Sequence, residues 1–399
     1  MQVYIVTLFL LILFDFLLKP RKTQQGKYRY AIFSYILLGG LSALRKYTVG
    51  NDLHYQYYGN FIKYHDLPWK YIYTVKTRYE PGFLTFFKLV GMVSENPQVM
   101  IAIHSLFVVG VFIFFMYKNC EDLPLAVYLF VTMNHWFQSM VILRQMLAVC
   151  IVIIATEILY GKNHWLIRYI IFSILVLLAI SMHYSAIVGF VFILIKHVKF
   201  GKTMFLMSTV IGYLLFVSNT FFDWGMEQVK NILSSSRFLS KQYSYFSSQL
   251  LQESKYTMSG LYSFVPYLAT FIFAGILLMG WRVAFSIRPG DWQARYERKV
   301  EFCGAYSNDF LMNSIMIIVM ARILAFSLPV FSRFTQYFMP FEYVLLGRVM
   351  KKIYSPMIRR ICLIVIYVVT ACAFYMMNSN LNLNAKMTGT VPYKFFWEY

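Results

Sequence analysis

The sequence predicts an all-α, polytopic membrane protein with about twelve transmembrane helices. Of its 399 residues, 59% are hydrophobic and only 14% are charged, whereas soluble domains carry about 25% charged residues. Apolar runs close to the ~20 residues that a helix needs to cross a bilayer recur along the whole chain. Because no Pro/Gly/Ser-rich linker divides these runs, residues 1–399 are predicted to form a single membrane domain.

The predicted spans are apolar segments separated by polar or charged loops. In order they are residues 2–19, 29–44, 97–117, 123–139, 145–160, 166–181, 184–198, 203–221, 261–281, 309–328, 334–349 and 361–377. Asp15 interrupts the first segment and no small-x-small cleavage site follows, so we expect a retained span rather than a signal peptide. The apolar segment near 80–93 contains Lys88 and is too short to cross, which predicts a half-helix or an interfacial helix.

The basic residues predict the orientation. More than half of the 37 Lys and Arg residues fall in one alternating set of short loops, and loops of this kind face the cytoplasm. Both ends of the chain are therefore predicted to face outside. The net charge of +20 then reflects topology and contact with anionic membrane lipids. Nucleic acid is not expected as a partner because no soluble basic domain is predicted. The five cysteines form no Cys-x-x-Cys or Cys/His pattern, so no metal site is expected.

Two large loops, residues 45–79 and 222–260, are predicted on the outer side. Ten of the 35 residues of the first loop are aromatic, and the charged or titratable residues among them are Arg45, Lys46, Asp52, His54 and Arg78. Aromatic rings stack on the apolar faces of sugars, although a belt of aromatic residues at the membrane interface would look similar. The charged residues so close to a predicted span favour a binding site. The second loop is polar without a distinctive pattern, which favours a solvated loop over a lid or an acceptor-docking surface.

Further polar residues are predicted at the outer ends of other spans. They are Arg144 with Gln145, His183, Arg322, Arg333 and Tyr337. A helix-end arginine can reach water along its aliphatic stem, and a lone histidine is usually a satisfied polar group. Arg322, however, is predicted to lie inside the hydrocarbon, where an arginine usually has a functional partner. Together with Asp52 and Glu80, these residues suit an anionic, lipid-linked substrate, because guanidinium groups bind phosphate oxygens through two parallel bonds. The inner loops contain no phosphate-binding loop for nucleotides.

The order of these motifs resembles the EpsG family of Wzy-like polysaccharide polymerases. The matching elements are Arg45 with Val49-Gly50-Asn51-Asp52, Glu80-Pro81-Gly82-Phe83, Arg144-Gln145-Met146-Leu147-Ala148, His183-Tyr184-Ser185-Ala186, Phe331-Ser332-Arg333-Phe334 with Tyr337-Phe338, and Val391-Pro392-Tyr393. Each motif is short, but five of them in order cover most of residues 45–340. Asn51 departs from the pattern, since many relatives have Thr there. The spacing from Asp52 to the tyrosine of the first motif is also shortened, to Tyr55, or shifted, to Gln56-Tyr57-Tyr58. Residues 222–310 match no element of the family.

The resemblance implies a bacterial inner-membrane protein of GT-C-like fold whose active site faces the periplasm. Such a protein moves a growing glycan from undecaprenyl diphosphate to a new lipid-linked repeat unit of O-antigen or capsule. The expected partners are the undecaprenyl-diphosphate-linked oligosaccharide, membrane lipids and a co-polymerase that sets chain length. Because arginines can supply the positive charge, a metal-independent glycosyltransferase with no cofactor is expected.

The resemblance also suggests roles for the polar residues. Arg144 and Arg333 are expected to hold the diphosphate, with Arg45 and Arg322 as second choices. Asp52 is the first choice of general base, and Glu80 and His183 are rivals for that role. The residues expected to contact glycan are Tyr55, Tyr58, Gln145 and Tyr337.

Three other functions compete with the polymerase. An O-antigen ligase uses the same lipid-linked glycan and similar periplasmic arginine and histidine chemistry. A lipid-linked oligosaccharide flippase would place ionisable residues near the membrane midplane, where Asp15 and Glu157 are the main candidates. A membrane acyltransferase is the third alternative, but its histidine-centred pattern is not found.

Overall fold

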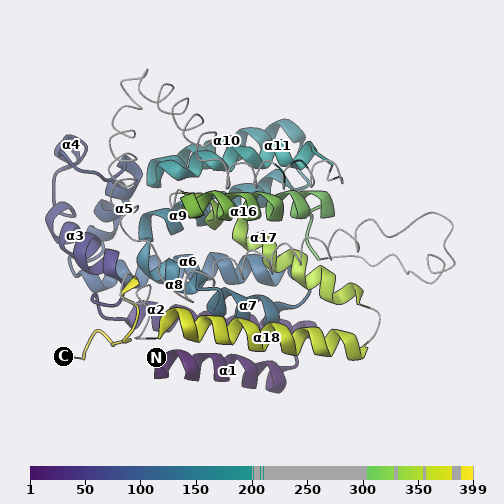
Figure 1. The fold of residues 1–399 in the computed structure, drawn as a ribbon. Coiled ribbons are helices and arrows are strands. Elements are labelled where there is room, and N and C mark those ends of the chain that lie inside the picture. Colours follow the sequence, from purple (N-terminus) through teal and green to yellow (C-terminus); the bar gives the residue numbers. More distant parts are fainter. Residues whose placement is uncertain are drawn as a thin grey trace. The chain divides into compact units, whose positions relative to one another are not determined.

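A computed structural model describes residues 1–199, 201, 207, 210, 303–327, 331–353, 356–379 and 388–398 (Figure 1). The regular structure of these residues is helical, and one isolated β-bridge pairs Arg45 with Phe395. The chain forms two compact units. Unit 1 comprises Met1–Ile193, Ile287–Tyr306 and Tyr343–Tyr399, and unit 2 comprises Leu194–Ser286 and Ser307–Glu342.

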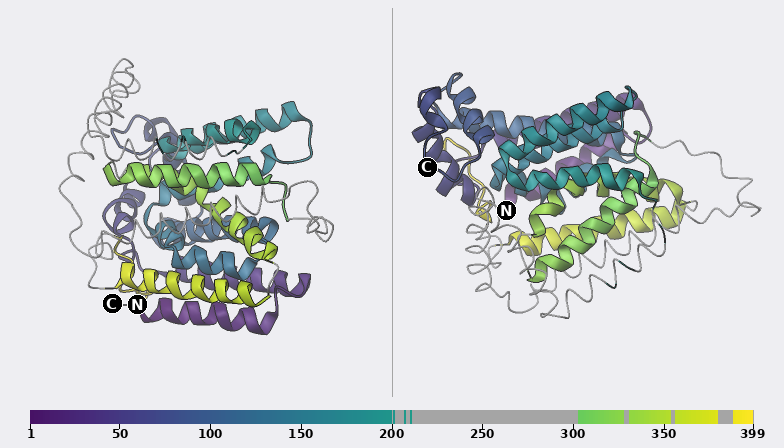
Figure 2. Two further views of the ribbon diagram at one scale, coloured as in Figure 1. Left: turned by 45° about the vertical axis from the view of Figure 1, so that its right-hand side comes forward. Right: turned by 90° about the horizontal axis from the view of Figure 1, so that it is seen from above.

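Unit 1 holds a bundle of helices with a group of short helices at one end. The bundle and its short helices are α1 (Gln2–Leu18), α2 (Gln24–Leu44), the π-helix η1 (Leu53–Tyr57), α3 (Tyr58–Tyr64), α4 (Trp69–Ile72), α5 (Pro81–Gly91), α6 (Pro97–Asn119), α7 (Leu123–Thr132), α8 (His135–Val141), α9 (Leu143–Leu159), α10 (Trp165–Met182), the 3-10 helix η2 (Tyr184–Phe190) and α18 (Pro356–Asn378). Helix α2 packs along α6, and α9 packs along α10. The short helices of loop 45–79 gather at one end, beside the C-terminal residues (Figures 1 and 2).

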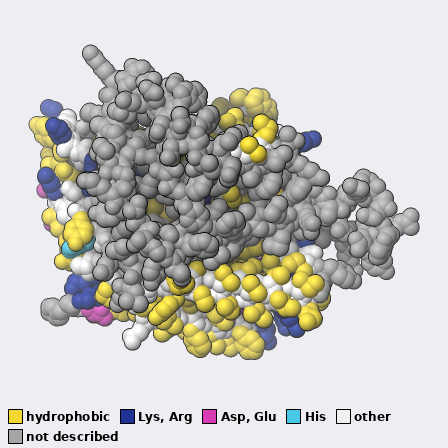
Figure 3. Space-filling model, in the orientation of Figure 1, with side chains coloured by type: hydrophobic (Ala, Val, Ile, Leu, Met, Phe, Trp, Pro, Cys, Tyr) yellow, Lys and Arg dark blue, Asp and Glu magenta, His cyan; other side chains and the backbone are white. Residues whose placement is uncertain are grey.

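The helices confirm a membrane protein, while the number of twelve spans stays a prediction. Among the described residues, α6, α10 and α18 are long and apolar enough to cross a bilayer. Large apolar side chains on α1, α10 and α18 are exposed, and Figure 3 shows a broad hydrophobic surface over α18 and α1. Such a surface is typical of a protein that contacts lipid. The predicted spans 203–221 and 261–281 and the predicted loop 222–260 lie outside the described residues.

The short helix expected near 80–93 is present as α5, but the predicted span 123–139 is not one continuous helix. Helix α7 ends at Thr132, and Asn134 adopts a left-handed conformation (φ 63°) before α8 begins. The polar groups at this break have partners within the protein, since Asn378 Nδ2 donates to Asn134 Oδ1 at 2.7 Å. A break inside an apolar segment is tolerated only where the protein itself satisfies the polar groups.

Ion pairs join the loops that are predicted to face the cytoplasm. Arg21 pairs with Asp122 at 2.8 Å and also with Asp15. Glu157 pairs with Lys118 and accepts a hydrogen bond from the Tyr306 hydroxyl at 2.5 Å. Asp15 and Glu157, the main candidates for the ionisable residues of a flippase, are therefore bound to basic residues near helix ends.

Residues 388–398, named here the C-terminal segment, pack against the beginning of loop 45–79. The amide of Gly50 donates to the carbonyl of Gly389 at 2.8 Å, and the Tyr4 hydroxyl donates to the Thr390 carbonyl at 2.6 Å. Gly389 has a φ of +63°, and a Cβ there would lie 2.0 Å from Asn51 Oδ1. Glycine is therefore required at this contact, which fixes the turn that precedes Asp52.

Unit 2 is built around α16 (Asn308–Ser327) and the first part of α17 (Phe331–Lys352). Phe310 and Phe341 pack edge to face with ring centroids 5.0 Å apart. Arg322 Nη2 lies 3.4 Å from Glu342 Oε1, and Glu342 is only 4% exposed. The arginine predicted inside the hydrocarbon thus has a buried carboxylate as its partner.

Candidate functional site

The site begins with a stretch of π-helix in loop 45–79. In η1 the amide of Tyr58 donates to the carbonyl of Leu53, five residues earlier, and π-turns of this kind are rare and often mark functional sites. Leu53 and Tyr57 are buried, while Asp52, Gln56 and Asn60 follow one another at four-residue spacing. Gln56 Nε2 donates to Asp52 Oδ1 at 3.2 Å, so Asp52 is the first member of a polar row.

Tyr79 connects this row to the rest of the site. Its hydroxyl donates to the Gln56 carbonyl at 2.9 Å and accepts a hydrogen bond from Asn60 Nδ2 at 2.9 Å. Burial raises the pKa of Tyr79 to about 12, so the hydroxyl remains protonated and able to donate. Two guanidinium groups approach the ring, with the Cζ of Arg144 5.1 Å and that of Arg78 6.0 Å from its centroid. Both lie within the ~6 Å range of a cation–π interaction.

Arg144 and Glu80 form a buried ion pair. Arg144 Nη1 lies 2.6 Å from Glu80 Oε2, and the two residues are 8% and 3% exposed. The same nitrogen donates to the Arg78 carbonyl at 3.3 Å, and Nε donates to the Tyr57 hydroxyl at 3.4 Å. Arg144 comes from the first turn of α9 and Glu80 from the N-cap of α5, so two motifs far apart in the sequence meet here.

The Glu-x-Gly element explains how Glu80 reaches its position. A Cβ on Gly82 would lie 2.3 Å from Ser181 Oγ and 2.8 Å from the Ser181 carbonyl carbon and oxygen. The start of α5 can therefore approach the end of α10 only because residue 82 is glycine. This contact places Glu80 beside the next turn, where the Tyr184 amide lies 3.4 Å from Glu80 Oε1.

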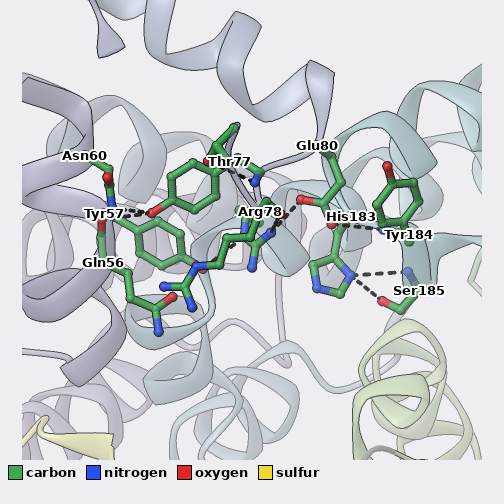
Figure 4. A network of polar contacts seen from close by, with 11 residues as sticks. Gln56, Tyr57, Asn60, Thr77, Arg78, Glu80, His183, Tyr184 and Ser185 are labelled. Carbon is green, nitrogen blue, oxygen red and sulfur yellow. Dashed lines mark hydrogen bonds and ion pairs between the residues drawn. The ribbon is translucent and has the colours of Figure 1, made fainter. Parts of the chain in front are cut away.

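His183 lies at the same turn. Its Nδ1 is 2.7 Å from Ser185 Oγ and accepts a hydrogen bond from the Ser185 amide at 3.3 Å. Because an amide can only donate, the proton of the neutral ring is assigned to Nε2. Figure 4 shows Gln56, Tyr57 and Asn60 on one side of this network and Glu80, His183 and Ser185 on the other. We name Glu80, Arg144, Tyr79, Tyr57 and the His183–Ser185 turn the Glu80 cluster.

Arg45 lies apart from the Glu80 cluster. It is 0% exposed, and its guanidinium donates to the Ser42 carbonyl, to Ser105 Oγ at 2.7 Å and to the Met140 carbonyl at 3.3 Å. These bonds join the end of α2 to α6 and α8. A diphosphate at Arg45 would have to replace them.

The residues predicted to contact glycan occupy different environments. Tyr55 is 75% exposed, and Tyr58 stacks on Tyr47 with ring centroids 4.3 Å apart. Gln145 is buried beside Arg144 in α9. Tyr337 is buried in unit 2, which also holds Arg322 and Arg333. The structure thus brings Glu80, Arg144 and His183 together and joins Asp52 to them through Gln56 and Tyr79.

Several residues of the network were missed from the sequence. Tyr79 is one of ten aromatic residues in its loop, and no local pattern distinguishes it. Tyr57 lies where the tyrosine of the first motif is shifted, but no role was predicted for it. Arg78, the second guanidinium on Tyr79, was recognised only as one of the charged residues of loop 45–79, without a role of its own. Glu342 could have been found, because an acid inside a predicted span calls for a partner.

The described residues contain no group of three or more His, Cys, Asp or Glu side chains that could hold a metal ion. A metal-independent reaction stays a prediction.

Comparison with known proteins gives one match, to a protein family, over nearly the whole chain. No curated protein and no solved structure matches it. The model of the EpsG family matches residues 28–395, which include the Glu80 cluster, most of unit 1 and all residues of unit 2. The chain therefore belongs to the EpsG family and is a membrane protein of polysaccharide biosynthesis.

Proposed function

We propose that the protein is a polysaccharide polymerase of the bacterial inner membrane with its active site at the periplasmic face. It transfers the growing glycan from undecaprenyl diphosphate to a hydroxyl of a new lipid-linked repeat unit of O-antigen or capsule. The observation that carries the proposal is the pair of guanidinium groups, Arg144 and Arg78, on the ring of Tyr79 beside the carboxylate of Glu80.

Glycosyl transfer from a lipid diphosphate needs two kinds of group. Cations stabilise the negative charge that develops on the departing diphosphate, and a base accepts the proton of the attacking hydroxyl. Arg144 supplies a fixed cation, and Arg78 supplies an exposed one on the same ring. Glu80, His183 and Asp52 are the candidate bases, and all three belong to one connected network.

The aromatic residues of η1 and its neighbourhood supply a surface for sugar. Tyr47 stacks on both Tyr58 and His54, with ring centroids 4.3 and 5.4 Å apart. Tyr55 extends from the same turn with most of its surface exposed. Stacked rings of this kind match the apolar faces of pyranoses. The roles predicted for Arg322, Arg333 and Tyr337 stay predictions.

The test is a deletion of the gene in its native background, followed by a silver-stained gel of the surface polysaccharide. Complementation uses the wild type, Asp52→Asn, Arg144→Ala and, as a control, Lys76→Ala, which removes an exposed cation from the same loop. We expect the deletion to reduce the ladder to core plus one repeat unit, and Arg144→Ala to behave like the deletion. Asp52→Asn should reduce the ladder in the same way only if Asp52 is the base. Lys76→Ala should restore the ladder. An unchanged ladder and an unchanged capsule after deletion would refute the polymerase.

The same gel separates the competing functions. Loss of all repeat units from the core would indicate a ligase or a flippase. A flippase is disfavoured by the pairing of Asp15 with Arg21 and of Glu157 with Lys118. These acids bind basic residues near helix ends, whereas a flippase would be expected to keep ionisable residues in a central cavity.

A further inference from the structure

We propose that Glu80 and Arg144 form an exchange pair, a mechanism that rests on the proposed function. In the resting protein Glu80 neutralises Arg144. When the lipid-linked substrate binds, a phosphate oxygen replaces Glu80 on the guanidinium, and the released carboxylate accepts the proton of the acceptor hydroxyl. Glu80 is then the general base, and the binding of the donor activates it.

The hydrogen bonds of Arg144 leave room for a phosphate. Nη1 and Nε donate to Glu80, to the Arg78 carbonyl and to the Tyr57 hydroxyl, whereas Nη2 donates to none of the described residues. Arg144 keeps 8% of its surface exposed, so the side chain is not fully enclosed. A guanidinium binds phosphate through two neighbouring N–H groups. Nη2 is the first of these, and Nη1 becomes the second when Glu80 leaves.

Glu80 is held in a way that allows it to leave. Its strong contact is the 2.6 Å bond to Arg144, and its other oxygen lies 3.4 Å from the Tyr184 amide, at the limit of hydrogen-bond length. Once the phosphate has taken Arg144, the Tyr184 amide is the one hydrogen-bond partner among the described residues that still restrains the carboxylate. A rotation of the side chain then turns it toward the acceptor.

Charge balance explains why the arrival of the phosphate and the release of Glu80 from Arg144 occur together. A buried arginine without an anion is strongly unfavourable, and so is a buried carboxylate without a cation. The exchange never leaves Arg144 without an anion, because the phosphate replaces the carboxylate. The carboxylate in turn loses its charge as soon as it accepts the proton.

In the transfer reaction two bonds form and two bonds break. The acceptor oxygen forms a bond to the anomeric carbon of the donor, and its proton moves to Glu80. The bond between the anomeric carbon and the phosphate oxygen breaks, and its electron pair stays on the diphosphate, where Arg144 stabilises it. After Glu80 returns its proton to water, the carboxylate competes for Arg144 again and promotes release of undecaprenyl diphosphate.

The test measures binding of free undecaprenyl diphosphate to purified protein in nanodiscs, next to the ladder assay in cells. Glu80→Gln removes the charge that competes with phosphate but is nearly the same size. We expect it to bind the probe about tenfold more tightly than the wild type and to give no ladder. Glu80→Asp keeps the charge on a shorter side chain. It should bind with an affinity between the two and give a short ladder.

The controls separate a failure of the exchange from a failure of the proposed function. Lys76→Ala should match the wild type in both assays. Equal or weaker binding by Glu80→Gln and by Glu80→Asp would overturn the exchange and leave Glu80 as a residue that positions Arg144. A normal ladder with Glu80→Gln would overturn its role as the base. Unchanged binding by Arg144→Ala would instead refute the assignment of Arg144 to the diphosphate, whatever Glu80 does.

Discussion

Replacement of Gly82 by alanine tests whether the close approach of α5 and α10 builds the site. The new Cβ would lie 2.8 Å from the carbonyl carbon and oxygen of Ser181, and ordinary contact begins at 3.4 Å. The two backbones must therefore separate by about 0.6 Å. The Tyr184 amide, already 3.4 Å from Glu80 Oε1, then loses its hydrogen bond. An overpacked contact costs about 1–3 kcal/mol, partly offset by the ~1 kcal/mol better helix propensity of alanine.

The expected result is a large loss of polymer with a small loss of stability. A misplacement of about 1 Å near the reacting groups can reduce a rate on the order of 100-fold, so a shift of this size should shorten the ladder to a few repeat units. Thermal unfolding in detergent should change by only a few degrees. Gly59→Ala is the matched control, because a Cβ at Gly59 meets nothing within 4 Å.

A second variant makes the test sharper. Combining Gly82→Ala with Ser181→Ala removes the Oγ contact at 2.3 Å but leaves both backbone contacts at 2.8 Å, so it should not restore the ladder. The reasoning is refuted if Gly82→Ala supports a ladder of normal length, or if the double variant recovers it fully.

Three further predictions concern other parts of the structure. Tyr79→Phe keeps the ring under Arg144 but removes a hydroxyl with two hydrogen bonds. The ladder should therefore persist, while the free energy of unfolding falls by about 1–2 kcal/mol. Loss of the ladder would show that the hydroxyl has a chemical role. Gly389→Ala should shorten the ladder because its Cβ would lie 2.0 Å from Asn51 Oδ1, and adding Asn51→Ala should restore part of it. Glu342→Leu removes the buried carboxylate that lies beside Arg322 and should destabilise the protein by about 1.5–3 kcal/mol, the usual worth of a hydrogen bond to a charged group. The double variant that also carries Arg322→Leu should be more stable than this single variant in the same unfolding assay.

The sequence predicted most helices and the convergence of three site residues. The helix near 80–93 could be predicted because its apolar run is too short to cross a membrane, and α5 covers Pro81–Gly91. The meeting of Glu80, Arg144 and His183 was expected because all three were predicted in outer loops or at the outer ends of spans, and because their motifs follow the order of the family. Its physical cause, the contact of Gly82 with Ser181, joins helices α5 and α10 that are far apart in the chain.

Other features depend on contacts that no local pattern reveals. The break at Asn134 lies in a continuous apolar run, and the side chain that satisfies it, Asn378, lies 244 residues later. Arg45 illustrates the same limit. An arginine directly after a predicted span is expected to be exposed. Arg45 is buried because Ser105 and the Met140 carbonyl provide acceptors for its guanidinium.

The C-terminal segment sets a condition on when the protein can become active during its synthesis. Most helices of unit 1 can enter the membrane as they leave the ribosome, but the turn before Asp52 gains its partner only when Gly389 has been made. The contact of Tyr4 with Thr390 closes a loop of 386 residues, and contacts of such long range form late in folding. A chain that is inserted but only partly synthesised would therefore lack the contacts that complete the turn before Asp52. The proposed polymerase activity would begin only after translation has reached this segment.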